Sequence, residues 1–328
     1  RSKPLNITAS DITQITSDAG VEFQPAISPD GKGVAFVAGP IGSPHLVIRS
    51  TANISGEGEA RTADTSLLRT FFPSWSPDGD RVRFLGCRAA GCVWSETGKM
   101  GGAVRPVPLP TRARASGTPA WSPDGSRVAF VLRDTIFLFS AADTTPRLIT
   151  VDSSGQTWLH SLAWSPDGRR IAYVNGNTDW RNSGNASQSF IRIVSAEGGP
   201  PEEVVADEHL NVSPTWLDDR HLLFVSNRDG PRGVYVVEVG PHGRRGEPRP
   251  VPGIADPHSI SYSVSAHTLA YAKFTLRQNV WSYPLGRSGP VSIRDGTPVT
   301  SGNQVIETHD ISPDGRWLAF SGNRRGTS

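Results

Sequence analysis

The fold is decided by AWSPDGSRVAFVL, residues 120–132, because close copies of this stretch recur along the chain. SWSPDGDRVRFLG starts at Ser74, AWSPDGRRIAYVN at Ala163 and DISPDGRWLAFSG at Asp310. In the shared Ser-Pro-Asp-Gly corner, proline presets φ for a turn, aspartate can bond the local backbone, and glycine accepts a positive φ. The apolar residues that follow alternate with a period of two, as in a half-buried strand. Each copy therefore predicts two antiparallel strands joined by a tight corner.

The copies are regularly spaced when each is anchored on the residue before its corner: Ile27, Trp75, Trp121, Trp164, Trp216, Tyr262 and Ile311. Successive anchors are 48, 46, 43, 52, 46 and 49 residues apart, and a period in the forties is typical of four-stranded propeller blades. We therefore expect an all-β fold, a β-propeller of four-stranded antiparallel blades, built by residues 1–328 as a single domain. Seven anchors favour seven blades, closed by pairing of Asp11–Thr16 with the last blade. Six blades are the alternative, in which Ile311 opens a further unit.

The corner residues are expected to be structural turn residues rather than catalytic groups. Every blade needs one such turn, so the repetition requires no chemistry. The residues concerned are Asp30, Gly31, Asp78, Gly79, Asp124, Gly125, Asp167, Gly168, Asp314 and Gly315. Two copies, anchored on Trp216 and Tyr262, keep the anchor and the following apolar strand but carry altered corners.

Two cysteines lie close together in FLGCRAAGCVW, where Cys87 and Cys92 flank a predicted hairpin tip. Opposed positions on paired strands can bring Cβ atoms near disulfide distance. We expect a disulfide, with free thiols as the alternative; two cysteines without a nearby histidine make a poor metal site. A disulfide would indicate an oxidising compartment.

Composition excludes several classes of protein. The 34 glycines and 27 prolines are too many for a helical bundle, and 36% hydrophobic residues are too many for a disordered chain. The formal net charge is +2, without a dense run of lysine and arginine, so no nucleic-acid partner is expected. No apolar run approaches the roughly 18 residues of a membrane span, so no direct membrane insertion is expected. Because the chain starts at Arg1 and stops inside a motif, we expect a fragment of a longer chain.

Candidate binding residues lie in the segments that lead into the first strand of each blade, where loops open onto a funnel at one end of the central channel. A few residues before the anchors stand Glu22, Thr70, Ser116, His160, Asn211, His258 and Glu307, with His309 nearby. One interpretation is that these are ordinary polar residues of solvated loops. The other is a funnel site, in which the histidines and glutamates bind a peptide terminus or a polar ligand. Such side chains also suit transition metals, but neither a metal nor another cofactor is predicted.

A long polar segment on the same side supplies two further candidates. NGNTDWRNSGNASQS, residues 175–189, links the second and third predicted strands of the fourth repeat. Trp180 and Arg181 are residue types enriched at binding hot spots. Loops of this length without structure of their own are uncommon and often functional, although a solvated hairpin is the simpler interpretation.

The repeats resemble the TolB-like family of WD40-like β-propellers. The resemblance rests on WSPDG at Trp75, Trp121 and Trp164, on ISPDG at Ile27 and Ile311, and on the strand after most of them, as in VAF, IAY or LAF. It covers essentially the whole chain and implies a propeller, usually of six blades in TolB itself. Members resemble periplasmic assembly factors, outer sensor ends of receptor kinases and propeller portions of serine peptidases, so the resemblance implies no single activity.

These observations favour a non-catalytic binding platform for a protein or peptide partner, in the periplasm or another extracytoplasmic compartment. The alternatives are the propeller portion of a larger serine peptidase or hydrolase and the outer sensor domain of a receptor kinase. A Gly-x-Ser-x-Gly nucleophile elbow and the kinase motif set are both absent from these 328 residues. The sequences that flank the chain would distinguish the alternatives.

Overall fold

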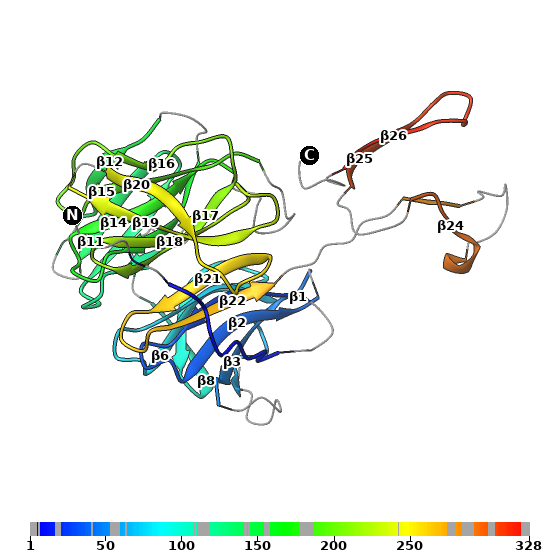
Figure 1. The fold of residues 1–328 in the computed structure, drawn as a ribbon. Coiled ribbons are helices and arrows are strands. Elements are labelled where there is room, and N and C mark those ends of the chain that lie inside the picture. The colour runs from blue at the N-terminus through cyan, green and yellow to red at the C-terminus, as the bar shows by residue number, and fades with distance from the viewer. Residues whose placement is uncertain are drawn as a thin grey trace. The chain divides into compact units, whose positions relative to one another are not determined.

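Each of the first five repeats folds as a small antiparallel sheet in the computed structural model (Figure 1). The structure describes residues 5, 7–16, 21–40, 42–52, 60–62, 64–107, 109, 119–140, 143, 145–153, 158–177, 187–241, 243–273, 280–283, 292–300 and 306–322. The chain divides into a first unit, Arg1–Thr178 with Ser187–Phe274, and a second unit, Asp179–Ala186 with Thr275–Ser328. No helix in the described ranges is long and apolar enough to cross a membrane.

Five sheets of the first unit contain four strands each, which pair in chain order. Sheet 1 consists of β1 (Val21–Ile27), β2 (Gly33–Gly39), β3 (His45–Ser50) and β4 (Ala60–Arg61). Sheet 2 consists of β5 (Arg69–Trp75), β6 (Arg81–Arg88), β7 (Gly91–Gly98) and β8 (Gly101–Pro106). Sheet 3 consists of β9 (Ala120–Trp121), β10 (Arg127–Leu132), β11 (Thr135–Ser140) and β12 (Arg147–Val151).

The same pattern continues in the next two sheets. Sheet 4 consists of β13 (Leu159–Trp164), β14 (Arg170–Asn175), β15 (Phe190–Ser195) and β16 (Glu202–Val205). Sheet 5 consists of β17 (Asn211–Asp218), β18 (His221–Ser226), β19 (Gly233–Gly240) and β20 (Gly243–Pro250). The prediction of an all-β propeller with small antiparallel four-stranded blades is therefore confirmed.

The number of blades differs from the prediction, because the described residues form five four-stranded blades rather than seven or six. The sixth anchor, Tyr262, lies near the end of β21 (Pro257–Ser263), which forms a two-stranded sheet with β22 (Thr268–Lys273). The seventh ends the first strand of another two-stranded sheet, β25 (Ile306–Ile311) with β26 (Leu318–Gly322). A short pair, β23 (Trp281–Ser282) with β24 (Thr297–Pro298), and the 3-10 helix η1 (Ile293–Asp295) lie between them in sequence. In the described residues, the sixth and seventh anchors thus each belong to a pair of strands around one corner.

The sheets of the first unit contact one another in a closed series. The first strands β1 and β5, β9 and β13, and β13 and β17 are in contact, and one apolar cluster joins sheets 2 and 3. β21 contacts both β17 and β1, so the two-stranded sheet connects sheet 5 back to sheet 1. There the backbone N–H of Ile27 donates to Ser261 Oγ at 3.1 Å, and Ala270 packs with the apolar residues of sheet 1.

The N-terminal segment does not form the expected closing strand with the last repeat. Residues 11–16 have no regular secondary structure. Instead, Ile15 packs against the apolar residues of sheet 1, and its carbonyl accepts a hydrogen bond from Arg49 Nη1 at 3.0 Å. The backbone N–H of Ala9 donates to the carbonyl of Pro252 at 3.0 Å. This segment therefore contacts both sheet 1 and the chain just after sheet 5.

The aromatic anchors explain how successive sheets are held together. The indole N–H of Trp164 donates to the carbonyl of Ala120 at 2.9 Å, and that of Trp216 donates to the carbonyl of Ala163 at 3.0 Å. Each bond joins an anchor to the residue before the preceding anchor. An arginine of the preceding sheet also covers each ring, with Arg170 Cζ 4.9 Å from the ring centroid of Trp216. Trp164 and Trp216 thus combine burial, a hydrogen bond and a cation–π contact between sheets.

The Ser-Pro-Asp-Gly corner forms a hydrogen-bonded turn, as residues 122–125 illustrate. The backbone N–H of Gly125 donates to the carbonyl of Ser122 at 2.8 Å, and Ser122 Oγ donates to Asp124 Oδ1 at 2.5 Å. Hydrogen bonds from Ser122 and then Ser126 lower the pKa of Asp124 to about 2. Gly125 has a φ of 72°, and a similar φ occurs at Gly31, Gly79, Gly168 and Gly315.

Replacing Gly125 by valine is expected to lower the free energy of unfolding by about 1–2 kcal/mol, because a β-branched residue is strained at this φ. The added Cβ would also lie 3.2 Å from Pro77 Cγ. Gly42→Val is the control, because its Cβ would enter open space without a left-handed φ. Urea unfolding measures both variants. Equal midpoints for the two would contradict the turn geometry.

Cys87 and Cys92 form a disulfide across the hairpin of β6 and β7. Their Cα atoms are directly opposed and 3.9 Å apart. The backbone N–H of Leu68 donates to the carbonyl of Cys87 at 2.8 Å. The disulfide therefore lies where the segment that leads into β5 meets this hairpin.

Candidate functional site

The predicted site belongs to one end of the sheets, which we call the funnel face. It carries the segments that lead into the first strands and the loops between second and third strands. The opposite end, the corner face, carries the Ser-Pro-Asp-Gly turns. Because strands in these sheets alternate in direction, successive loops fall on opposite ends.

The described first-unit residues that were predicted for the funnel lie in strands rather than in loops. Glu22 is in β1, His160 in β13 and His258 in β21, and both histidines are buried. The first strand begins several residues before its anchor, so it includes positions that the sequence analysis assigned to the preceding loop. The expectation of solvated loop residues is therefore wrong for the two histidines.

His160 connects two segments of the funnel face. Its Nε2 is 2.7 Å from the carbonyl oxygen of Gly176, and its Nδ1 is 2.9 Å from Ser161 Oγ. The carboxylate of Glu22 accepts a hydrogen bond from Thr16 Oγ1. These contacts hold neighbouring segments against the first strands.

The remaining predicted residues are dispersed or lie outside the description. Thr70 in β5 and Asn211 in β17 are buried. His309 is exposed in β25 of the second unit, and Glu307 is in the same strand. Trp180, Arg181 and Ser116 lie outside the described residues.

Four first strands carry an irregularity that the sequence analysis missed. Three residues before the anchor, Gln24, Phe72, Ser161 and Ser213 have φ values of 56°, 56°, 53° and 54°, and the strand register shifts beside each of them. Such bulges redirect side chains. Gln24 Oε1 accepts from the backbone N–H of Phe72 at 2.7 Å, and Ser213 Oγ accepts from that of Ile260 at 3.0 Å. The four positions share only their place in the sequence, three residues before the anchor, because their residue types differ.

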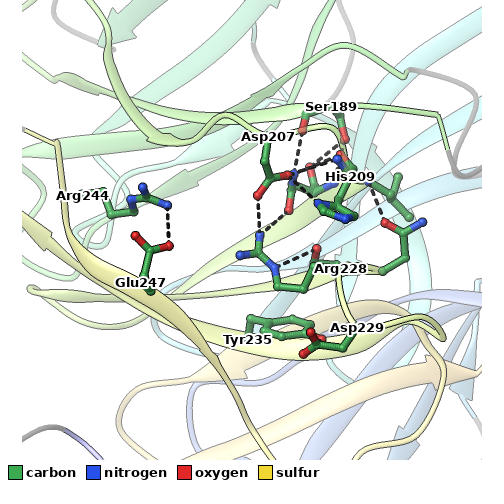
Figure 2. Close-up of polar contacts among 12 residues, drawn as sticks. Ser189, Asp207, His209, Arg228, Asp229, Tyr235, Arg244 and Glu247 are labelled. Atoms are coloured by element: carbon green, nitrogen blue, oxygen red, sulfur yellow. Dashed lines mark hydrogen bonds and ion pairs between the residues drawn. The ribbon is translucent and has the colours of Figure 1, made fainter.

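A polar network lies on the funnel face of sheets 4 and 5 (Figure 2). We call Ser189, Asp207, His209, Asn211 and Arg228 the rim cluster. The side-chain amide of Asn211 donates to Asp207 Oδ1 at 2.8 Å and to the carbonyls of Ser189 and His209, each at 3.0 Å. Ser189 Oγ exchanges two hydrogen bonds of 2.9 Å with the backbone of Asn211. Asn211 therefore joins the loop after β14 to the segment that leads into β17.

Arg228 connects a third segment, the loop between β18 and β19, to the rim cluster. Its Nη2 lies 3.1 Å from Asp207 Oδ2 and 2.9 Å from Asn211 Oδ1. Its guanidinium carbon lies 5.0 Å from the ring centroid of Tyr235. Burial opposes the charge of Asp207, but hydrogen bonds from Asn211 and His209, with the charge of Arg228, outweigh it and lower the pKa of Asp207. The network thus holds three loops with an ionised carboxylate at its centre.

Tyr235 beside the rim cluster predicts an alkaline effect on stability. Its hydroxyl donates to Asp229 Oδ2 at 2.8 Å; burial, this bond and the negative charge raise the pKa of Tyr235 to about 12. An unfolded tyrosine ionises near pH 10. The stability that the folded chain gains from keeping Tyr235 protonated is therefore complete below about pH 10 and is lost as pH rises through about 12. Tyr235→Phe should therefore show a smaller fall in the free energy of unfolding between these pH values. Urea unfolding across that range tests this, and an unchanged slope would contradict it.

The chemistry of this face is that of a fixed polar surface. Asn211, Ser189 and Asp207 are satisfied by one another, by Arg228 and by the backbone. No group of three or more histidine, cysteine, aspartate or glutamate side chains among the described residues could hold a metal ion. Trp158, in the segment that leads into β13, is exposed on the same face, and the sequence analysis did not select it.

Comparison with known proteins tests the fold. No protein-family model and no curated protein matches the chain. Among solved structures, a putative TolB from Agrobacterium tumefaciens is similar, with a TM-score of 0.55 and 18% identity over 79% of this chain and 93% of that chain. TolB from Acinetobacter baumannii gives a TM-score of 0.53 and 17% identity over 73% of this chain and 59% of that chain.

The chain has a TolB-like β-propeller fold. The resemblance seen in the repeats is thus confirmed at the level of fold. A structure of a nidogen–laminin complex is also similar, with a TM-score of 0.51 and 12% identity over 72% of this chain and 81% of that chain. At these identities the similarity of the TolB-like propeller to solved structures shows the fold alone.

Proposed function

We propose that this TolB-like propeller is a non-catalytic binding platform that holds a protein or peptide partner on its funnel face. The observation that carries the proposal is the rim cluster, in which Asn211 and Arg228 join three loops of this face. Loops held in place before binding lose less conformational entropy when a partner arrives. In sheet 4, the contacts of His160 with Gly176 and Ser161 likewise hold the end of β14 against β13.

The proposal places the chain in an extracytoplasmic compartment, such as the periplasm. The disulfide between Cys87 and Cys92 supports this, because disulfides persist in oxidising compartments and are rare in reducing ones. The similarity to TolB structures supports a propeller that acts by binding.

Site-specific crosslinking tests the choice of face. A photoreactive benzoylphenylalanine is placed at Leu68 or Ser153, which are exposed on the funnel face. In matched variants it replaces Lys99 or Met100, which are exposed in the turn between β7 and β8 on the corner face. After irradiation of cells that natively produce the chain, we expect partner adducts from the funnel-face variants alone. Adducts of equal yield from both faces, or from the corner face alone, would overturn the proposal.

A further inference from the structure

Trp158 is the largest exposed apolar side chain on the described funnel face, with 55% of its surface accessible. Leu132 and Val151 nearby are 37% and 50% exposed. Both lie opposite Thr135 in sheet 3, so their side chains share one face of that sheet. We call Leu132, Arg133, Val151 and Trp158 the Trp158 patch.

Backbone hydrogen bonds join the parts of the Trp158 patch across two sheets. The N–H of Leu159 donates to the carbonyl of Arg133 at 3.1 Å, and the N–H of Asp152 donates to the carbonyl of Asp134 at 2.8 Å. The carbonyl of Trp158 accepts from Gly176 at 3.2 Å. The segment that carries Trp158 is therefore bonded to the hairpin of β10 and β11 and to the end of β14.

A buried ion pair is formed by Asp152, the residue that follows Val151 of the Trp158 patch. Asp152, whose side chain is fully buried, accepts a hydrogen bond of 2.8 Å from the hydroxyl of Tyr173. The other carboxylate oxygen of Asp152 lies 2.8 Å from Arg192 Nη1. The patch thus combines exposed apolar side chains with a backbone that is held before any partner binds.

Arg133 gives the patch its charge. It is exposed and has a φ of 60°, a value that two-residue hairpin turns such as that between β10 and β11 adopt at their first central residue. Among the described residues its guanidinium makes no ion pair or hydrogen bond. Of the nearby acids, Asp152 pairs with Arg192, while Asp134 accepts from Thr135 Oγ1 at 3.0 Å.

The same combination occurs at the corresponding end of sheet 2. Leu68 is 56% exposed there, and the neighbouring Arg69 is also exposed. Within the described part of the chain, Arg69 likewise makes no ion pair or side-chain hydrogen bond. Asp64, on the same face, is paired with Arg88. Sheets 2 and 3 are joined by a shared apolar cluster, so the two Leu-Arg pairs stand on adjacent sheets.

We propose that the Trp158 patch binds an extended segment of a partner protein that presents an acidic side chain beside a large apolar one. The apolar side chain packs on Trp158, while the carboxylate pairs with Arg133, an arrangement of aromatic and arginine that is typical of binding hot spots. The second Leu-Arg pair lets the same type of segment continue toward sheet 2. This inference rests on the proposed function and names the chemistry of the partner.

Fluorescence anisotropy with three labelled probe peptides tests this chemistry on the whole chain. The probes are glycine-flanked peptides that alternate glutamate with phenylalanine, lysine with phenylalanine, or glutamate with serine. We expect the glutamate–phenylalanine probe to bind at least about tenfold more tightly than either of the others. Trp158→Ala and Arg133→Glu should each weaken that binding by about tenfold or more, and Arg133→Lys should weaken it less.

Matched controls come from the corner face, where Met100→Ala and Arg169→Glu change exposed side chains of the same kinds. Both should bind the glutamate–phenylalanine probe like the parent chain. Thermal unfolding confirms that each variant is folded. Equal binding of the glutamate and lysine probes, or binding unchanged in both Trp158→Ala and Arg133→Glu, would overturn the inference. Self-association of the parent chain that Trp158→Ala abolishes would also overturn it, by identifying a second copy as the occupant.

The outcomes separate this inference from the proposed function. Funnel-face crosslinks together with unchanged probe binding in the patch variants reject the Trp158 patch and leave the platform in place. Crosslinks that fail at the funnel face reject the platform itself, whatever the probe peptides do.

Discussion

Replacing Asp152 by alanine is expected to lower the free energy of unfolding by about 3–5 kcal/mol, because it breaks a buried ion pair. The Asp152 side chain is fully buried and accepts from both Tyr173 and Arg192. Its removal takes away a carboxylate 2.8 Å from the Arg192 guanidinium, which is itself mostly buried; the pair of Arg192 with the exposed Glu203 is retained. It also leaves the hydroxyl of Tyr173 without its acceptor. Urea unfolding at neutral pH measures the loss.

The control for Asp152 is Asp80→Ala. Asp80 pairs with Lys99 at 2.8 Å, but both side chains are largely exposed. Exposed pairs contribute about 0–1 kcal/mol, so little change is expected. Tyr173→Phe removes the hydroxyl alone and should cost about 1 kcal/mol while preserving the pair of Asp152 with Arg192. Equal losses for Asp152→Ala and Asp80→Ala would show that the buried network does not stabilise the sheets.

Replacing Trp216 by alanine is expected to cost about 3–5 kcal/mol, as for other large buried aromatic residues. Trp216 is buried, its indole N–H donates to Ala163, and Arg170 covers its ring. The substitution therefore opens a cavity and removes two contacts between sheets 4 and 5. Trp216→Phe retains most of the packing but loses the indole N–H, so its loss should be smaller. Chemical denaturation followed by circular dichroism measures both.

Trp158→Ala is the matched control for Trp216, since it removes an exposed indole from the same unit. A surface substitution of this kind usually changes stability by less than about 0.5 kcal/mol. Equal losses in the free energy of unfolding for Trp216→Ala and Trp158→Ala would show that the anchors do not hold successive sheets together.

The fold was predictable where its determinants are local. The corner around Asp124 and Gly125 needs only a few consecutive residues to form its turn, and the strand after it is recognisable from alternation. The spacing of the tryptophan anchors then predicted the propeller. The mechanism that makes them anchors, an indole bond to the preceding sheet, joins residues more than 40 positions apart, such as Trp164 and Ala120. It was therefore not visible in a single repeat.

The number of blades was not predictable in the same way. Third and fourth strands have weaker patterns than the strands around a corner, and their pairing depends on neighbours distant in sequence. The repeat anchored on Tyr262 contains the inner signals, and in the described residues its anchor strand β21 forms a two-stranded sheet with β22. The anchors therefore indicate strand pairs more reliably than complete blades.

The candidate site was predictable only in outline. His160 and Asn211 were predicted to belong to the funnel face. Both side chains are buried, however, and bond to neighbouring loops instead of facing solvent. Asn211 works with Ser189 and Arg228, which come from other loops and share no motif with it. The exposure of Trp158 depends on tertiary packing and could not be recognised from sequence.

Binding of a partner on the funnel face is tested by hydrogen–deuterium exchange with and without the partner captured by crosslinking. We expect slower exchange on the funnel face, in residues 187–189, 206–210 and 227–232 around the rim cluster, and unchanged exchange in the Ser-Pro-Asp-Gly corners. Slower exchange confined to the corners, with the rim cluster unaffected, would contradict it.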